Sequence, residues 1–307
     1  MKIKFILILF LQFIFFNPIL FSDEVDILSD NIKILDNGKI IESIQTNAII
    51  KGKGLYIEGD YSVYNKETEI IKFEKNVLFN DRTKNIKVET ENAEFNQRLD
   101  ILETIGITNI KIENKYEIIS SNMFYDRKSQ KIYSKSETTI KDISGNIYNL
   151  ENSFQFDLNK EIITTEKTNI IDTDNNIYIF EKAKINLVTK EILGKELKID
   201  FVDNYFGISN NDPILKGRSA LSNDKQTKIY KTVFSTCNTT GKSCPGWEIE
   251  TEEFTHDKIN CNLSISSIDI SFSMLFLTMS NTVFYRIDIK MTPCFVQRIS
   301  PFFSCSS

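Results

Sequence analysis

Hydrophobic and polar residues alternate with a period of two along most of this chain. In the first clear run, Leu55, Ile57, Tyr61 and Val63 fall on one parity, and mostly polar residues occupy the other. The same alternation places further apolar residues on one parity of later runs: Ile71, Phe73, Val77, Phe79, Leu197, Ile199 and Phe201. This period predicts β-strands with one buried face and one solvated face. No comparable helical stripe follows the first residues.

A second pattern has a period of about 30 residues. An aromatic or aliphatic residue followed by Asn or Asp recurs at steps of 31, 30, 31 and 29 residues. The five pairs are Tyr64-Asn65, Phe95-Asn96, Tyr125-Asp126, Phe156-Asp157 and Ile185-Asn186. Asn and Asp favour turns, so each repeat predicts two strands around a turn.

Stacked hairpins bury their apolar faces if the two resulting sheets fold toward each other. We therefore expect an elongated all-β protein with two facing antiparallel sheets, an apolar trough between them and open sheet edges at its ends. Open edges invite pairing with another β-structure.

The first residues differ from the rest. Lys2 and Lys4 precede an apolar run that ends before Asp23, which is typical of a secretory signal peptide at 1–22. An uncleaved N-terminal anchor is the alternative. Removing the two lysines changes the formal charge from −5 to −7, because −5 − 2 = −7. This acidic balance disfavours a nucleic-acid binder.

Composition changes again toward the end. Residues 259–307 carry only five charged residues, whereas residues 23–258 carry 72. We divide the chain into a signal peptide at 1–22, a repeat-built region at 23–228, a Cys-containing segment at 229–258 and a divergent tail at 259–307.

One segment suggests a family. The run Phe234-Ser-Thr-Cys237, the run Cys244-Pro-Gly-Trp-Glu-Ile249 and His256-Asp-Lys258, together with the upstream repeat, resemble the periplasmic OstA-like part of the LptD lipopolysaccharide-assembly family. The resemblance covers roughly residues 25–258. It implies an elongated β-jellyroll exported to the periplasm and associated with the outer membrane. The family continues into a transmembrane barrel, which the tail does not resemble. We expect a truncated or frame-disrupted member, and a divergent short form is the alternative.

The resemblance also implies a role. It implies lipopolysaccharide as the ligand, an LptA-like bridge protein as a partner by edge-strand pairing, and an LptE-like lipoprotein as a partner of a full-length barrel. The expected lipid-groove residues are Ile57, Tyr61, Val63, Ile71, Phe73, Val77, Phe79, Leu197, Ile199 and Phe201. The alternatives are a stand-alone bridge protein like LptA or LptC, and a secreted β-repeat scaffold whose apolar faces are simply its core.

Cysteine and histidine supply the remaining candidate chemistry. In an exported chain, Cys237 and Cys244 are disulfide candidates, with each other or with other cysteines. Zinc bound by Cys237, Cys244, His256 and Cys261 is a rival, but the close Cys pair usual in structural zinc sites is missing. His256 has no recognisable nucleophile beside it, so we expect a histidine at a strand end or in a turn. A hydrolase that uses His256 is the less favoured alternative. We expect no enzyme activity, no metal and no cofactor.

Overall fold

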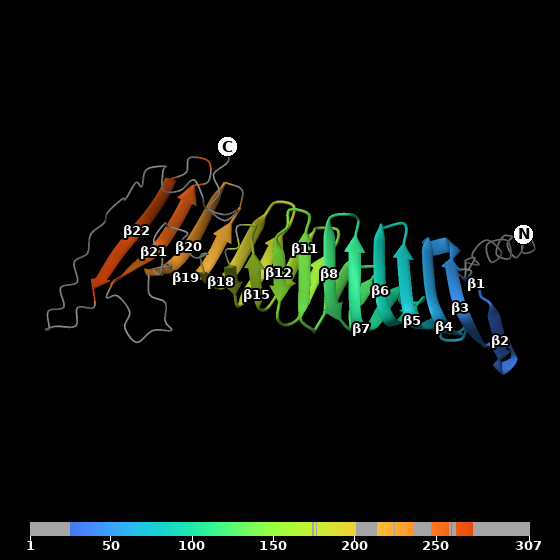
Figure 1. Cartoon of the computed structure of the whole chain (residues 1–307). Helices are drawn as coiled ribbons and strands as arrows, with labels where there is room; N and C mark the ends of the chain where they lie inside the picture. Colours follow the sequence, from blue (N-terminus) through green and yellow to red (C-terminus); the bar gives the residue numbers. More distant parts are fainter. Residues whose placement is uncertain are drawn as a thin grey trace, which may run out of the picture.

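The protein is an extended stack of antiparallel strands. The computed structural model describes residues 25–173, 175, 177–200, 214–223, 225–235, 247–257, 259 and 262–272. These residues form 22 strands in one continuous sheet, with two short 3₁₀ turns, η1 (Asp36–Gly38) and η2 (Lys51–Lys53). Figure 1 shows the strands in one long row, with β2 near one end and β22 at the other. The expected elongated all-β fold is confirmed.

Strand length divides this row into three parts. Long strands occupy both ends: β3 (Ile40–Ile50), β4 (Leu55–Asn65), β5 (Ile70–Asp81), β6 (Ile86–Asn96) and β7 (Ile101–Ile112), then β18 (Glu191–Asp200), β19 (Ile214–Ser222), β20 (Gln226–Ser235), β21 (Trp247–Asp257) and β22 (Asn262–Phe272). Between β7 and β18 the strands are short. We find the same short form in β1 (Val25–Leu28) and β2 (Asn31–Leu35), which precede β3.

The short strands separate into two layers. Layer A contains β1, β8 (Tyr116–Ser121), β11 (Thr138–Asp142), β12 (Ile147–Leu150), β15 (Thr168–Ile171) and β16 (Ile177–Phe180). Layer B contains β2, β9 (Phe124–Asp126), β10 (Lys131–Ser134), β13 (Phe154–Asp157), β14 (Ile162–Thr165) and β17 (Lys182–Asn186). Each long strand contributes one half to each layer. For example, β7 pairs with β8 through its second half and with β9 through its first half.

A line of backbone irregularities lets the long strands bend from one layer into the other. The pairing register shifts between Glu58 and Tyr61 in β4, between Glu74 and Val77 in β5, and beside Glu91 in β6. Gln45, Gly106 and Glu196 adopt positive φ angles at the corresponding points of β3, β7 and β18. β-bulges bend a strand sharply. The sheet is therefore folded along its whole length, and we call the fold line the crease.

Small hydroxyl residues line the inside of this crease. They are all buried: Ser43, Thr46, Ser62, Thr104, Thr108, Ser120, Ser134, Thr138, Thr165, Thr168, Thr232 and Thr251. A bulge leaves backbone groups without a ladder partner, and buried backbone groups need one. Several of the hydroxyls supply it; for example, Thr104 Oγ1 accepts from the Met123 amide at 2.9 Å. Ser134 Oγ donates to the Ser121 carbonyl at 2.9 Å.

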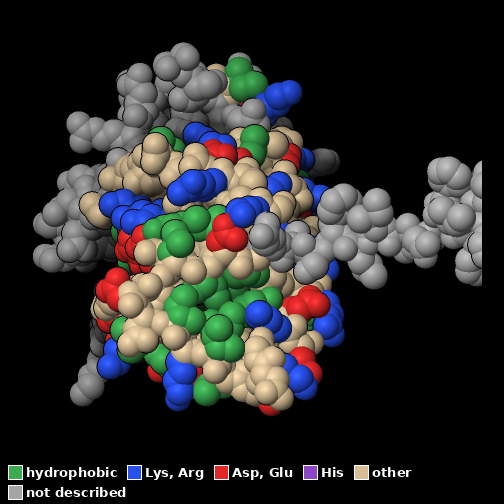
Figure 2. Space-filling view, turned by 90° about the vertical axis from the view of Figure 1, so that its right-hand side faces the viewer, with side chains coloured by type: hydrophobic (Ala, Val, Ile, Leu, Met, Phe, Trp, Pro, Cys, Tyr) green, Lys and Arg blue, Asp and Glu red, His purple; other side chains and the backbone are tan. Residues whose placement is uncertain are grey.

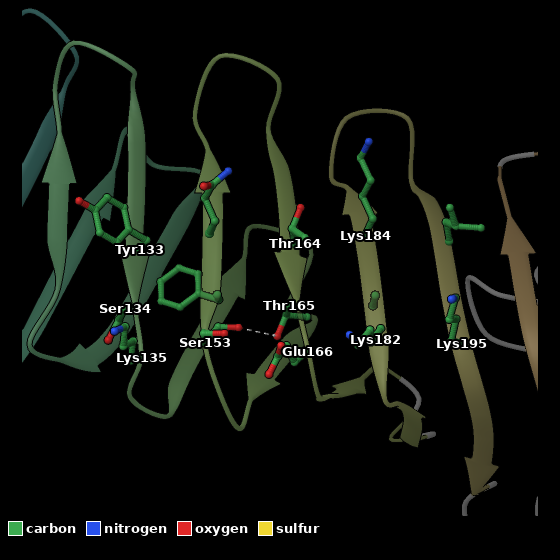
Figure 3. A pocket seen from close by; sticks show the side chains of 14 residues that line it. Tyr133, Ser134, Lys135, Ser153, Thr164, Thr165, Glu166, Lys182, Lys184 and Lys195 are labelled. Atoms are coloured by element: carbon green, nitrogen blue, oxygen red, sulfur yellow. Dashed lines mark hydrogen bonds between the residues drawn. The ribbon is translucent and has the colours of Figure 1, made fainter.

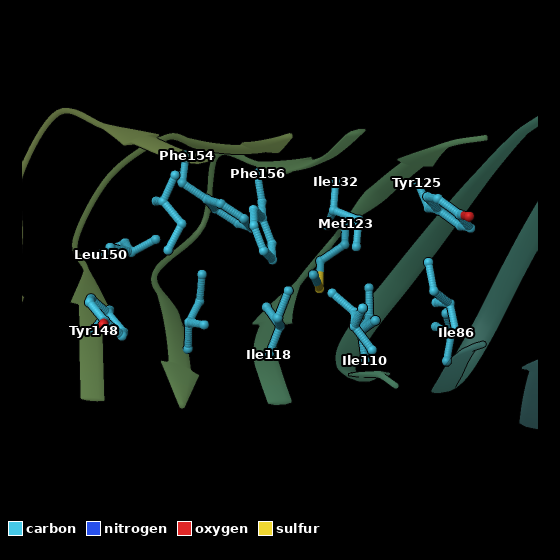
Figure 4. Close-up of a cluster of buried hydrophobic side chains, with 14 of the residues drawn as sticks. Ile86, Ile110, Ile118, Met123, Tyr125, Ile132, Tyr148, Leu150, Phe154 and Phe156 are labelled. Atoms are coloured by element: carbon cyan, nitrogen blue, oxygen red, sulfur yellow. The ribbon is translucent and has the colours of Figure 1, made fainter. Parts of the chain in front are cut away.

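The apolar core fills the space between the layers. Figure 4 shows side chains of both layers facing each other, among them Ile118 from layer A and Ile132 from layer B. Aromatic contacts join the layers. The ring centroids of Phe79 in layer A and Tyr125 in layer B lie 6.3 Å apart in an edge-on arrangement. Tyr116 and Phe156 make a similar contact at 5.5 Å.

The 30-residue repeat corresponds to one strand end in layer B. Each of the five pairs forms the last two residues of a strand: β4, β6, β9, β13 or β17. The Asn or Asp does not itself adopt the left-handed conformation; its side-chain oxygen instead accepts turn amides, as Asn96 Oδ1 does from Leu99 at 2.9 Å. The left-handed residue comes four positions later in all five repeats: Glu69, Asp100, Gln130, Glu161 and Lys190.

Successive turns are also joined to each other. The residue after the Asn or Asp donates its amide to the left-handed residue of the preceding turn, as Gln97 does to Glu69 at 3.0 Å and Arg127 to Asp100 at 3.1 Å. Such stacking requires nearly equal repeat lengths, which explains the regular spacing of the five pairs.

The composition change near residue 259 does not end the sheet. Asn262–Phe272 forms β22, which pairs with β21 through ten residue pairs from Trp247↔Phe272 to Asp257↔Asn262. The proposed boundary at 228/229 falls inside β20. The origin of the tail in a disrupted reading frame stays a prediction.

Gly194 offers a test of the packing beside the crease. A Cβ atom at this position in β18 would lie 2.2 Å from Cδ1 of the Phe180 ring. We expect Gly194→Ala to lower the free energy of unfolding by about 1–3 kcal/mol, as overpacking does, measured by chemical denaturation. Phe180→Leu should relieve the clash, so the double variant should lose less than the two single losses combined. Additive losses would contradict this explanation.

Candidate functional site: the interior between the layers, its clasp and an outer groove

Most of the predicted lipid-groove residues lie inside the sandwich. Seven of the ten, Ile57, Ile71, Phe73, Val77, Phe79, Leu197 and Ile199, are at most 2% exposed and belong to one core cluster. Phe201 lies outside the described residues. The buried residues contact one another across the layers, so in this structure they form a filled core and not an exposed groove.

The predicted inward orientation of Tyr61 and Val63 is wrong. The prediction placed them on the face of Leu55 and Ile57, but the bulge between Glu58 and Tyr61 reverses the parity of β4. Ser62 is consequently buried, and Val63 lies on the outer face opposite Lys72 and Glu42. A two-residue period cannot be extended through a bulge, because the additional residue exchanges the two faces.

The interior is exposed at the β2 end of the stack. Ile32 and Ile34 of β2 lie opposite Ser43 and Ile41, which places them on the inner face of layer B. They are nevertheless 45% and 66% exposed, because no further strand of the described chain covers them. Figure 2 shows hydrophobic side chains gathered in the middle of this end, with charged groups around them.

Opposite the crease, the turns of the two layers meet along a line that we call the mouth. A cluster of charged residues joins the two sides of the mouth, and we call it the clasp: Lys53, Asp81, Asp100 and Arg127. Lys53 lies in the turn after β3 and Asp81 is the last residue of β5, both in layer A, whereas Asp100 and Arg127 lie in layer B turns. Arg127 Nε donates to Asp81 Oδ2 at 2.7 Å, and its Nη1 donates to Asp100 Oδ1 at 2.8 Å.

The remaining contacts complete the clasp. Arg127 Nη2 donates to the Lys53 carbonyl at 3.0 Å, and Lys53 Nζ donates to the Gln97 carbonyl at 2.6 Å and to Asp100 at 3.2 Å. Tyr125 donates its hydroxyl to Asp81 at 3.1 Å. The side chains of Asp81 and Arg127 are 0% and 8% exposed. The clasp is therefore a shielded ionic network that holds the layers together.

A second contact across the mouth lies further along the stack. Tyr116 donates its hydroxyl to Glu161 Oε2 at 2.5 Å, and Lys115 Nζ lies 3.2 Å from Glu161 Oε1. Lys115 lies in the β7–β8 turn and Tyr116 is the first residue of β8, both in layer A, whereas Glu161 lies in the β13–β14 turn of layer B. The mouth is thus held at two successive places.

Electrostatics favour the ionised clasp. Burial raises the pKa of the Asp81 carboxyl, but hydrogen bonds from Arg127 and Thr83, together with the Arg127 charge, outweigh burial and hold that pKa below its ordinary value. Burial lowers the pKa of Arg127, and the two carboxylates reverse this and raise it.

Sequence reasoning missed the clasp, although one signal was present. Asp81 occupies the same parity as Val77 and Phe79, so the alternation places a carboxylate on the buried face. A charge on a buried face requires a partner of opposite charge. Nothing in the sequence indicates that this partner is Arg127, which is 46 residues away.

A shallow groove of about 600 Å³ lies outside the core, on layer B. Its lining comes from β10, β13, β14, β17 and β18 and the segments beside them. Figure 3 shows Tyr133, Thr164, Lys182, Lys184 and Lys195 on these neighbouring strands. The alternation alone does not indicate the groove, because its outward residues are ordinary solvent-facing positions.

The other predicted chemistry is only partly visible. Cys237, Cys244 and Cys261 lie outside the described residues, as does the expected signal peptide at 1–22. His256 is buried and is the second-last residue of β21, which places it at a strand end, one of the two expected positions. Among the described residues, no three His, Cys, Asp or Glu side chains gather as a metal site, and no helix has the length and hydropathy to cross a membrane.

No protein-family model matches this chain, and no curated protein matches it. The fold and the site define a class by themselves: a repeat-built, two-layered antiparallel β-sandwich with a continuous apolar interior, exposed at the β2 end.

Arg127→Met tests the clasp. Removing the guanidinium leaves the Asp81 carboxylate buried without its partner, so we expect a loss of about 3–5 kcal/mol in the free energy of unfolding. Arg98→Met is the matched control, because Arg98 forms an exposed pair with Glu69 at 3.3 Å and such pairs contribute about 0–1 kcal/mol. If chemical denaturation gave equal losses of unfolding free energy for Arg127→Met and Arg98→Met, the clasp would not stabilise the contact between the layers.

Asp81 also predicts a pH dependence. Because its pKa is lowered in the folded state, its ionised form stabilises the fold above the ordinary aspartate pKa of about 3.9, and this contribution disappears as the pH falls below that value. We expect the free energy of unfolding of the wild type to fall more steeply below about pH 4 than that of Asp81→Asn. Parallel pH profiles of the two proteins would contradict the assignment.

Proposed function

We propose that this protein carries an amphipathic glycolipid between its two β-layers, as the resemblance to the periplasmic part of the LptD family suggests. In this proposal the chain is exported and associates with the outer membrane. It receives lipopolysaccharide from an LptA-like bridge protein and acts by binding, not by catalysis. An LptE-like lipoprotein would join where a full-length barrel exists.

One observation carries the proposal: the apolar interior runs without a break through the stack and is exposed at the β2 end. Burying acyl chains there is favourable by about 25 cal/mol per Å² of apolar surface, or about 0.8 kcal/mol per methylene. The sugar part of the lipid would stay in water beyond the mouth. Within the described residues, β1 and β2 each pair only with β3, so their outer edges beside the open end would offer strand pairing to a bridge protein.

Lipid entry requires the layers to part, because the core residues fill the interior. At the crease the layers are joined by the continuous strands and by their hydrogen bonds. The layers would therefore separate at the mouth. The clasp and the Tyr116–Glu161 contact are the interactions that such movement must break.

The filled interior also favours a second candidate, a secreted β-repeat scaffold whose apolar faces are only its core. A stand-alone bridge protein like LptA or LptC shares the lipid-carrying mechanism of the first proposal, so it is not distinguished by the interior. The scaffold predicts no lipid between the layers.

Site-specific photo-crosslinking separates these candidates. A photo-reactive residue at Phe73 or Ile199 should capture lipopolysaccharide in cells, because both side chains point between the layers. Lys72 and Lys198 are the matched controls on the adjacent outward positions, and Tyr61 should behave like them after the correction to its face. Capture from the outward positions alone, or from none, would refute carriage between the layers.

A further inference from the structure

We infer that the groove on the outer face of layer B is a binding site for an anionic amphiphile, a molecule with one hydrocarbon chain and an acidic head. This site is separate from the interior, and the inference holds whether or not the interior carries lipid. It rests on the charge balance and the apolar surface of the groove.

The outward residues of the groove lie in two adjacent rows that cross the strands. In the first row, Tyr133 lies opposite Gln155, Thr164 opposite Lys184, and Lys184 opposite Leu193. The second row runs beside the crease and contains Lys135, Glu166, Lys182 and Lys195. The volume of about 600 Å³ is within the range of small-molecule sites.

The charge balance of the groove is unusual. It contains four lysines, Lys135, Lys182, Lys184 and Lys195, but a single carboxylate, Glu166. All four lysines are exposed, and none of them forms an ion pair within the described chain. The whole protein carries a net charge of −5, so this positive patch opposes the overall balance.

Two of these lysines face each other directly. Lys182 and Lys195 are cross-strand partners in β17 and β18, which places their Cβ atoms about 5 Å apart on the same outer face. Like charges at this separation are destabilising. An anion held between the two ammonium groups removes the repulsion and adds charge-assisted hydrogen bonds.

Several outward lysines elsewhere in the sheet have a carboxylate close by. Lys33 lies opposite Glu42 and Lys72 opposite Glu94, with nitrogen–oxygen distances of 3.6 and 2.9 Å. Lys87 and Lys111 also face each other, yet Lys87 holds Glu89 at 2.6 Å and Lys111 holds Glu117 at 3.9 Å. Lys182 and Lys195 face each other without such a carboxylate, so an anionic ligand in the groove would supply the counter-charge.

The apolar part of the groove indicates the rest of the ligand. Leu193 is 57% exposed, and its cross-strand neighbour Leu221 on β19 is also exposed. At the other end, the Tyr133 ring stacks on Phe124 with centroids 5.2 Å apart. A hydrocarbon chain lying over Leu193 and Leu221 would cover this apolar surface while its head contacts Lys182 and Lys195. The acidic head could be a phosphate or a carboxylate, and these are separate arms of the test.

Binding of soluble amphiphiles to the full chain tests this inference. The probes are dodecyl phosphate, laurate and the uncharged dodecyl maltoside, each below its micelle concentration, together with inorganic phosphate. We expect dodecyl phosphate or laurate to bind, dodecyl maltoside to bind more weakly, and inorganic phosphate to bind at least about tenfold more weakly than dodecyl phosphate. Equal affinity of inorganic phosphate and dodecyl phosphate would overturn the hydrocarbon part of the assignment.

The variant Lys182→Ala/Lys195→Ala distinguishes a ligand site from a structural role. It should weaken binding of the acidic amphiphile about tenfold or more, while thermal stability stays equal or rises because a repulsion is removed. Lys141→Ala/Lys160→Ala removes the same charge from exposed positions elsewhere and should leave binding unchanged. Equal losses in both double variants would mean non-specific attraction and would overturn the site.

Leu193→Ser tests the apolar half of the groove. It should weaken the binding of dodecyl phosphate but not the binding of inorganic phosphate. A bulky photo-reactive residue at Phe73 tests the interior separately. Amphiphile binding that survives Lys182→Ala/Lys195→Ala but is lost on changing Phe73 would place the ligand between the layers and overturn this inference. Failure of lipopolysaccharide capture at Phe73 leaves the groove assignment unaffected.

Discussion

The folded sheet depends on the hydrogen bonds between buried hydroxyl side chains and backbone groups at the crease. Where such a bond is present, its loss would leave a buried amide or carbonyl without a partner, at a cost of about 1–3 kcal/mol. Ser and Thr are suited to this position because they are small and carry one donor and two acceptor lone pairs. Thr104 and Ser134 each satisfy a backbone group where the chain passes from β8 to β9: the Met123 amide and the Ser121 carbonyl respectively.

The crease and the mouth hold the layers in different ways. At the crease the chain itself passes from one layer to the other, so separation there is impossible without breaking the strands. At the mouth the layers are held by the clasp and by Tyr116 and Glu161, which are side-chain contacts between turns. A carrier that opens on one side would require this difference between the two sides. In a rigid scaffold, the same contacts would simply hold the layers together along a second line.

Ligand binding in the interior and in the outer groove would depend on different interactions. The interior is apolar and filled, and a ligand there must displace packed side chains. The groove is exposed, and its lysines already repel each other, so an anion improves the charge balance without rearranging the core. The two regions can be tested independently, because the lysines of the groove point away from the interior.

The sequence by itself determined the fold class, the repeat and most of the core, since alternation and turn chemistry act over a few neighbouring residues. Ile57, Phe73 and Ile199 were located in this way. Only the tertiary structure decided the faces of Tyr61 and Val63, because a bulge reverses parity and leaves no clear mark in the sequence. It also decided the clasp and the opposed Lys182 and Lys195, since both depend on which distant strands and turns the folded sheet places side by side.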